Sequence, residues 1–140
     1  MCIRDRHGYP GKSLVGKEQA STAFFVIQHA DLAFQEKYLP LLKQAADAKE
    51  IRWRSVALLV DRVHVGQGKK QIYGSQYTRD ETTGNFYFFP IENPYKIDSV
   101  RATVGLSSFQ KYADRANIKW DAAAHIEFHK KRAAPVGEKN

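Results

Sequence analysis

The hydrophobic pattern of this chain changes its period part-way along, and that change limits the folds open to it. From residue 17 to residue 65, apolar side chains recur every three to four positions, which is the spacing of one helix face. After Gly66 and Gly68, short extended runs rich in Ile, Tyr, Thr and Phe take over. The order of the two patterns predicts an α+β domain, mainly helical, with one β-hairpin packed against the helices.

The expected elements follow from the residues that start and stop them. Asp31 is a helix-capping residue, and Gly66 is a typical helix stop. The sequence between the two extended runs, residues 80–85, is a turn signal. We expect helices over residues 17–30, 31–48, 54–65, 98–105 and 108–116, hairpin strands over 71–79 and 85–89, and an amphipathic stretch over 121–131.

Length and composition fit one domain. The chain has 140 residues, of which 43% are hydrophobic, so it can form a hydrophobic core without disulfides or structural metals. Cys2 is the only cysteine, which excludes an intramolecular disulfide. We expect residues 1–6 to be a non-native leader, residues 7–116 to form a single α+β domain, and residues 117–140 to be a basic tail, either helical or frayed.

Charge and hydropathy limit the classes of partner expected for this protein. The net charge of +7 favours non-specific attraction to nucleic acid, but the lysines and arginines are spread along the chain rather than gathered in one patch. A dedicated nucleic-acid surface is therefore not expected. Apolar runs are far shorter than the roughly 20 residues that a membrane helix needs, and no signal peptide is seen. These features predict a cytoplasmic protein without a membrane partner, and they say nothing about its oligomeric state.

Two apparent motifs do not carry their usual chemistry. Gly11-Lys12-Ser13 resembles the end of a phosphate-binding loop, but Arg6 stands where that loop needs a glycine, and no buried strand precedes it. His125 and His129 lie one helical turn apart, but the intervening residues do not follow the His-Glu-x-x-His order. We therefore expect neither a metal site nor a bound cofactor.

A first group of candidate site residues lies where the first helix ends. His29 stands two residues before Asp31, so a carboxylate could orient the imidazole for proton transfer. His7 is a second candidate for the general acid or base. The structural alternative is that His29 completes the helix end and Asp31 only caps the next helix.

A second group lies on the third helix and the first extended run. Arg62 can clamp an anion with its planar fork, or it can pair with an acidic neighbour such as Asp61. Gln71, Tyr73 and Gln76 are polar residues of a half-buried run, and buried amides need partners. Those partners are either the backbone of the protein or a ligand.

Five blocks of residues stand out by their order and spacing: His7–Pro10 with Ser13–Gly16, Gln28–Asp31, Asp61–Val63, Gln71–Gln76, and Pro90–Asn93 with Asp98, Arg101 and Gly105-Leu106. Together they resemble a bacterial family of unknown function, domain of unknown function 6624. The resemblance covers about residues 7–112, and it is specific because both order and spacing agree. It implies that the N-terminal part of the family is missing from this chain.

The resemblance carries no activity, but polar residues at set spacings are what a site requires. One hypothesis is a polar cleft that binds a small polar or anionic ligand and acts as a hydrolase or transferase. His29, His7 and Asp31 would then be catalytic, and Gln28, Arg62, Gln71, Tyr73 and Gln76 would bind the ligand. The alternative is a non-catalytic binding or interaction module, in which the same polar residues form a structural network.

Overall fold

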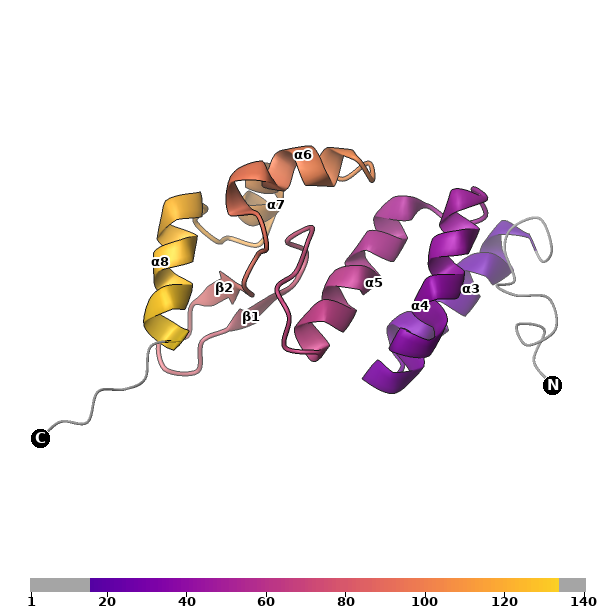
Figure 1. The fold of residues 1–140 in the computed structure, drawn as a ribbon, viewed down its shortest axis with the longest axis horizontal. Coiled ribbons are helices and arrows are strands. Elements are labelled where there is room, and N and C mark those ends of the chain that lie inside the picture. The colour runs from indigo at the N-terminus through magenta and orange to yellow at the C-terminus, as the bar shows by residue number, and fades with distance from the viewer. Residues whose placement is uncertain (1–15, 134–140) are drawn as a thin grey trace, which may run out of the picture.

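The computed structural model describes residues 16–133, and it confirms a mainly helical α+β fold. Figure 1 shows the first three helices side by side in one half of the molecule, and the hairpin and the last helix in the other half. The elements in chain order are α3 (Lys17–Gln28), α4 (Leu32–Asp47), α5 (Trp53–Gly66), β1 (Tyr77–Arg79), β2 (Phe86–Phe88), the 3-10 helix η1 (Pro94–Lys96), α6 (Ile97–Ala102), α7 (Phe109–Arg115) and α8 (Ala122–Ala133).

The helices α3, α4 and α5 enclose the first core. Their bounds lie close to the predicted ones, because the capping residue acts as the sequence indicates: the Asp31 carboxylate accepts a hydrogen bond from the Phe34 backbone N–H at 2.9 Å and starts α4. Ile27, Leu42 and Leu59, one from each helix, are fully buried in this core. Burying side chains of this size stabilises the fold by about 1.5–3 kcal/mol each.

The hairpin is shorter than the extended pattern predicts. Its two strands are antiparallel, with Tyr77 opposite Phe88 and Arg79 opposite Phe86. Residues 71–76 lie outside the hairpin, and Gln71 makes only an isolated parallel bridge to Ile91. The alternation over 71–76 therefore comes from a loop held by side chains, and not from a strand.

A second core lies under the hairpin. Phe88 and Phe109 are buried there with their rings 4.7 Å apart, and Trp120 packs edge-on against Phe109 at 4.4 Å. Ile91 and Ile97 complete the core from the connection after β2. The chain thus forms two apolar clusters, and the loop 71–76 runs where α5 meets the hairpin half (Figure 1).

The last helix, α8, extends the packed part of the chain beyond the boundary expected at residue 116. His129 contacts the Phe88 carbonyl oxygen through Nε2 at 2.9 Å, and the Ile91 N–H donates to His125 Nε2 at 3.2 Å. Through these two bonds α8 packs on β2 and on the connection after it. Between residues 16 and 133, no helix is both long and apolar enough to span a bilayer.

Candidate functional site

The carboxylate of Asp61 is the centre of a buried polar network. Asp61 lies on α5, is fully buried, and accepts four hydrogen bonds from the loop that follows the helix. The donors are the backbone N–H groups of Ile72 (2.8 Å), Tyr73 (2.9 Å) and Ser75 (2.8 Å) and the Ser75 hydroxyl (2.7 Å). Four donors offset the cost of removing a charged carboxylate from water. Asp61 therefore holds the loop in place.

Gln71 closes the same loop from its other end. Its side-chain Nε2 donates to the carbonyl oxygens of Gln76 and Phe89, both at 2.9 Å, and its Oε1 accepts from the Gln76 N–H at 2.8 Å. Gln71 is fully buried, so these bonds supply the partners that a buried amide needs. Both polar ends of the side chain are bonded to the backbone of the protein.

Arg101 connects this loop to the hairpin half of the molecule. It is buried on α6, and it donates to the carbonyl oxygens of Tyr73 (2.8 Å) and Ser107 (2.7 Å). Its guanidinium lies over the rings of Phe109 and Tyr112 at 5.4 and 4.9 Å. Burial lowers the pKa of Arg101, although the charges of Tyr112 and Asp61 act in the opposite direction and raise it. The Tyr112 hydroxyl donates to the Ser75 carbonyl oxygen. We use the name polar seam for the set of residues Asp61, Gln71, Ser75, Arg101 and Tyr112.

Tyr73 and Gln76 belong to the loop that the polar seam holds. Tyr73 uses its backbone N–H and carbonyl for the bonds to Asp61 and Arg101, and its half-buried ring packs against the first core. Burial and the nearby Asp61 charge raise the pKa of its phenol. Gln76 donates through Nε2 to the Ser75 hydroxyl at 3.2 Å. Both residues therefore take part in holding the loop.

The other candidate residues lie at the junction of α3 and α4. Arg62 Nη1 donates to the backbone carbonyl oxygen of Gln28 at 2.7 Å. The guanidinium therefore meets the backbone of Gln28 and not its side-chain amide. His29 is exposed and packs edge-on against Phe25 at 4.2 Å. The exposed Asp31 uses its carboxylate for the helix cap.

The structure thus brings the described candidates together in two groups. Gln28 and Arg62 meet at the helix junction, and His29 and Asp31 follow Gln28 closely in the chain. Gln71, Tyr73 and Gln76 meet in the loop 71–76. Within residues 16–133, no hydrogen bond joins a side chain of one group to a side chain of the other. His7 lies outside the described residues. A catalytic cleft that joins all of these side chains stays a prediction.

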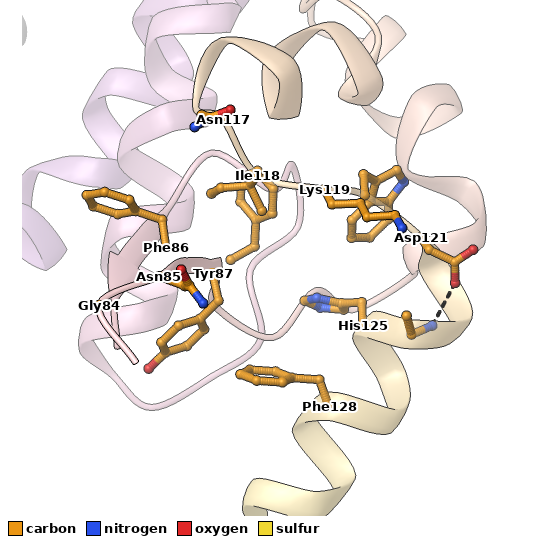
Figure 2. Close-up of a pocket in the computed structure, with 13 residues that line it drawn as sticks. Gly84, Asn85, Phe86, Tyr87, Asn117, Ile118, Lys119, Asp121, His125 and Phe128 are labelled. Carbon is orange, nitrogen blue, oxygen red and sulfur yellow. Dashed lines mark hydrogen bonds between the residues drawn. The ribbon is translucent and has the colours of Figure 1, made fainter. Parts of the chain in front are cut away.

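A groove lies elsewhere, between β2 and α8, with a volume of about 860 Å³. Figure 2 shows Phe86 and Tyr87 on one side of it, His125 and Phe128 on the helix opposite, and Ile118 and Lys119 at its upper edge. We call it the aromatic groove. Its walls are mainly aromatic rings and side-chain amides, contributed by Gly84, Asn85, Phe86, Tyr87, Phe88, Asn117, Ile118, Lys119, Trp120, Asp121, Ala124, His125 and Phe128.

The rings that line the aromatic groove are held by contacts with one another. Tyr87 and Phe128 lie 5.2 Å apart, and Trp120 contacts His125 at 5.3 Å. Asp121, also in the wall, accepts from the Ala124 N–H at 2.7 Å and starts α8 (Figure 2). The groove was not predicted from the sequence, because residues 117–140 were expected to form a tail outside the domain. The signal that could have found it is the pair His125 and Phe128, three residues apart on an amphipathic stretch next to Trp120.

Two histidines fasten α8 to the strand. His125 accepts the Ile91 N–H through Nε2, so that nitrogen carries no proton, while His129 meets a carbonyl and must donate. Burial, with a smaller contribution from the neighbouring His129, lowers the pKa of His125 to about 4. Burial also lowers the pKa of His129. Across residues 16–133, no group of three or more metal-ligating side chains forms.

Comparison with known proteins bears on the residues of the polar seam. The model of a family described as "Family of unknown function (DUF6624)" matches residues 3–122. The chain belongs to the DUF6624 family. Neither the curated proteins nor the solved structures yield a significant match to this chain.

The residues matched by the DUF6624 model include the polar seam but only part of the aromatic groove. The whole polar seam, from Asp61 to Tyr112, lies inside the matched residues. The match ends at residue 122, so His125 and Phe128, which form the helical wall of the aromatic groove, lie beyond it. The match begins at residue 3, inside the segment expected to be a leader. The expected loss of an N-terminal part concerns residues before those described, and it stays a prediction.

The attachment of α8 in this DUF6624 domain should depend on pH. The pKa of His125 is about 4 in the fold and about 6.5 in an unfolded chain, so the unfolded state binds the proton first. Stability from this site is therefore complete above pH 6.5 and is lost as the pH falls toward 4. We expect the urea midpoint of the wild type to drop between pH 7 and pH 4.5 more than that of His125→Gln, whose amide oxygen can still accept from Ile91. Equal drops in the two proteins would contradict this role of His125.

Proposed function

We propose that this DUF6624 domain is a non-catalytic binding module: its polar seam holds the fold, and its ligand binds in the aromatic groove. The observation that carries the proposal is the contrast between the polar seam and the aromatic groove. The polar residues at the centre of the chain are bonded to the protein itself, whereas the aromatic groove offers solvent-reachable rings.

The polar seam supports the first half of the proposal. A binding or catalytic side chain needs a polar atom turned toward a ligand, but the Asp61 carboxylate accepts four internal donors, and both ends of the Gln71 amide are bonded. Arg101 is enclosed by carbonyl oxygens and two rings. Such saturated networks hold elements in one arrangement.

The composition of the aromatic groove supports the second half. Its volume of about 860 Å³ lies within the range of about 300–1,000 Å³ of small-molecule sites. Aromatic walls with a few amides and one lysine suit stacking and orientation of a ligand. Among the described residues of its lining, none is a serine, threonine or cysteine, the residues that most often serve as nucleophiles.

Trp120 provides a reporter for this proposal, because it lines the aromatic groove and the second tryptophan, Trp53, packs against the first core. In a Trp53→Phe background, fluorescence would be recorded against a panel of small aromatic compounds, short peptides and oligonucleotides. We expect at least one class to shift the Trp120 emission. Mass spectrometry of the same mixtures should show no conversion of the compounds.

A matched pair of alanines on α8 serves as the control. Ala124 lines the groove and Ala123 does not, although both are exposed. Ala124→Leu narrows the groove and should weaken the shift about tenfold, a loss of about 1.4 kcal/mol, whereas Ala123→Leu should leave it unchanged. Absence of any shift, equal effects of the two variants, or turnover of a panel compound would each contradict the proposal.

A further inference from the structure

The outer edge of β2 borders the aromatic groove. In an antiparallel ladder, residues alternate between pairs that exchange hydrogen bonds and pairs whose N–H and C=O point away from the partner strand. The Phe89 N–H donates to Gln76 and the Asp80 N–H donates to Asn85 at the two ends of this hairpin. The register then makes Phe86 and Phe88 the residues whose backbone groups point outward.

These outward groups form a short strand edge. The Phe88 carbonyl oxygen is already used by His129 of α8, which agrees with the outward direction. The N–H and C=O of Phe86 and the N–H of Phe88 have no hydrogen-bond partner among residues 16–133. Such an edge is a template for another extended chain.

The far wall of the groove leaves room on this edge. α8 meets β2 at His129 and lies opposite the strand at His125 and Phe128, and the aromatic groove occupies the space between them (Figure 2). A third strand lies about 4.7–4.9 Å from its neighbour and points alternate side chains to opposite sides. The rings of Phe86 and Phe128, 50% and 37% exposed, can cover apolar side chains of such a strand.

The net charge of the chain favours an occupant of one sign. Lys119 lies in the wall, and Arg132 stands over Tyr87 and Phe128 at 4.8 and 5.4 Å. The carboxylates of Asp80, which pairs with Arg132 at 2.8 Å, and of Asp121, which caps α8, balance these two cations locally. The chain as a whole carries +7. An acidic segment is therefore attracted by the net charge of the chain as a whole.

We propose that the β2 edge binds an extended, acidic peptide segment of a partner protein, which adds to the hairpin as a third strand within the aromatic groove. This inference rests on the proposed function and names its class of ligand. Backbone hydrogen bonds to Phe86 and Phe88 supply affinity, and the aromatic walls select the side chains at alternate positions. Single-stranded nucleic acid also stacks on exposed rings, but it does not use a strand edge.

The test begins with selection from a displayed library of random ten-residue peptides, panned on the full chain. Two variants isolate the strand edge: Phe86→Pro removes both the ring and the outward N–H, whereas Phe86→Leu removes only the ring. Because Phe86 does not donate to β1, proline at this edge leaves the hairpin ladder intact. Circular dichroism melts check that both variants fold, and a 20-nucleotide oligothymidine serves as the nucleic-acid probe.

We expect the selected peptides to share net negative charge and alternating apolar residues without proline. Their affinity should fall about tenfold more in Phe86→Pro than in Phe86→Leu, and Lys119→Glu should weaken binding further. Absence of a consensus, a basic consensus, equal binding by the two Phe86 variants, or oligothymidine competing for the same groove would overturn the inference. If panel compounds still shift Trp120 in a manner sensitive to Ala124→Leu, the proposed function stands although the peptide inference fails.

Discussion

Asp61→Ala is expected to lower the free energy of unfolding by about 3–5 kcal/mol, a large share of the roughly 5–15 kcal/mol that holds a domain of this kind together. The substitution leaves four donors of the loop 71–76 without their acceptor, three of them backbone N–H groups. Each buried donor left unpaired costs about 1–3 kcal/mol, partly relieved by relaxation. Urea denaturation followed by circular dichroism measures the change.

Asp114→Ala is the matched control for this prediction. Asp114 is an exposed aspartate whose carboxylate accepts one bond, from Gln110 at 2.7 Å, so its loss should cost less than about 1 kcal/mol. Asp61→Asn should fall between the two variants, because its amide keeps one acceptor oxygen but turns a donor toward other donors. If Asp61→Ala unfolded at the same urea concentration as Asp114→Ala, the polar seam would not be what holds the two halves together.

Gly74→Ala is expected to destabilise the domain by about 2–5 kcal/mol through two separate effects. The backbone at Gly74 has φ of 74°, in the left-handed region, which costs other residues about 1–2 kcal/mol. A Cβ at this position would also lie 2.5 Å from Cε2 of Phe109, whose ring is fully buried. Forcing an atom into a packed core adds about 1–3 kcal/mol. Denaturant midpoints measure the sum.

Gly105→Ala separates the two effects. Gly105 has nearly the same φ, 75°, but a Cβ there would meet no heavy atom within 4 Å. It should therefore show the backbone cost alone, and the difference between the two variants measures the close approach of the loop to Phe109. Equal losses of stability would mean that the buried ring can move aside, contrary to the tight packing that we infer for the second core.

The local signals in the sequence were sufficient for most of the fold. The helical period, the Asp31 cap and Gly66 at the end of α5 predicted the first three helices to within a few residues, because these signals act between residues close in the chain. The hairpin was predicted from its turn and extended runs. Its first strand was predicted too long, since alternation of polar and apolar residues is also compatible with a loop fixed by buried side chains.

The role of the polar residues depended on contacts that a one-dimensional pattern does not contain. Asp61 and Gln71 could have served a ligand or the backbone, and the structure joins both to the loop 71–76. The same holds for Arg101, whose partner Tyr73 lies 28 residues earlier in the chain. A polar residue signals that it needs partners, but the identity of those partners depends on which backbone groups the packed helices bring to it.

The sequence by itself therefore determined that this chain forms helices followed by a hairpin, because capping, periodicity and turn residues act locally. Only the tertiary structure decided that α8 packs on the hairpin and that a groove opens between them. That arrangement depends on His125 and His129 meeting backbone groups 34 and 41 residues away. Contacts at such separations arise when the two cores assemble, and no local pattern encodes them.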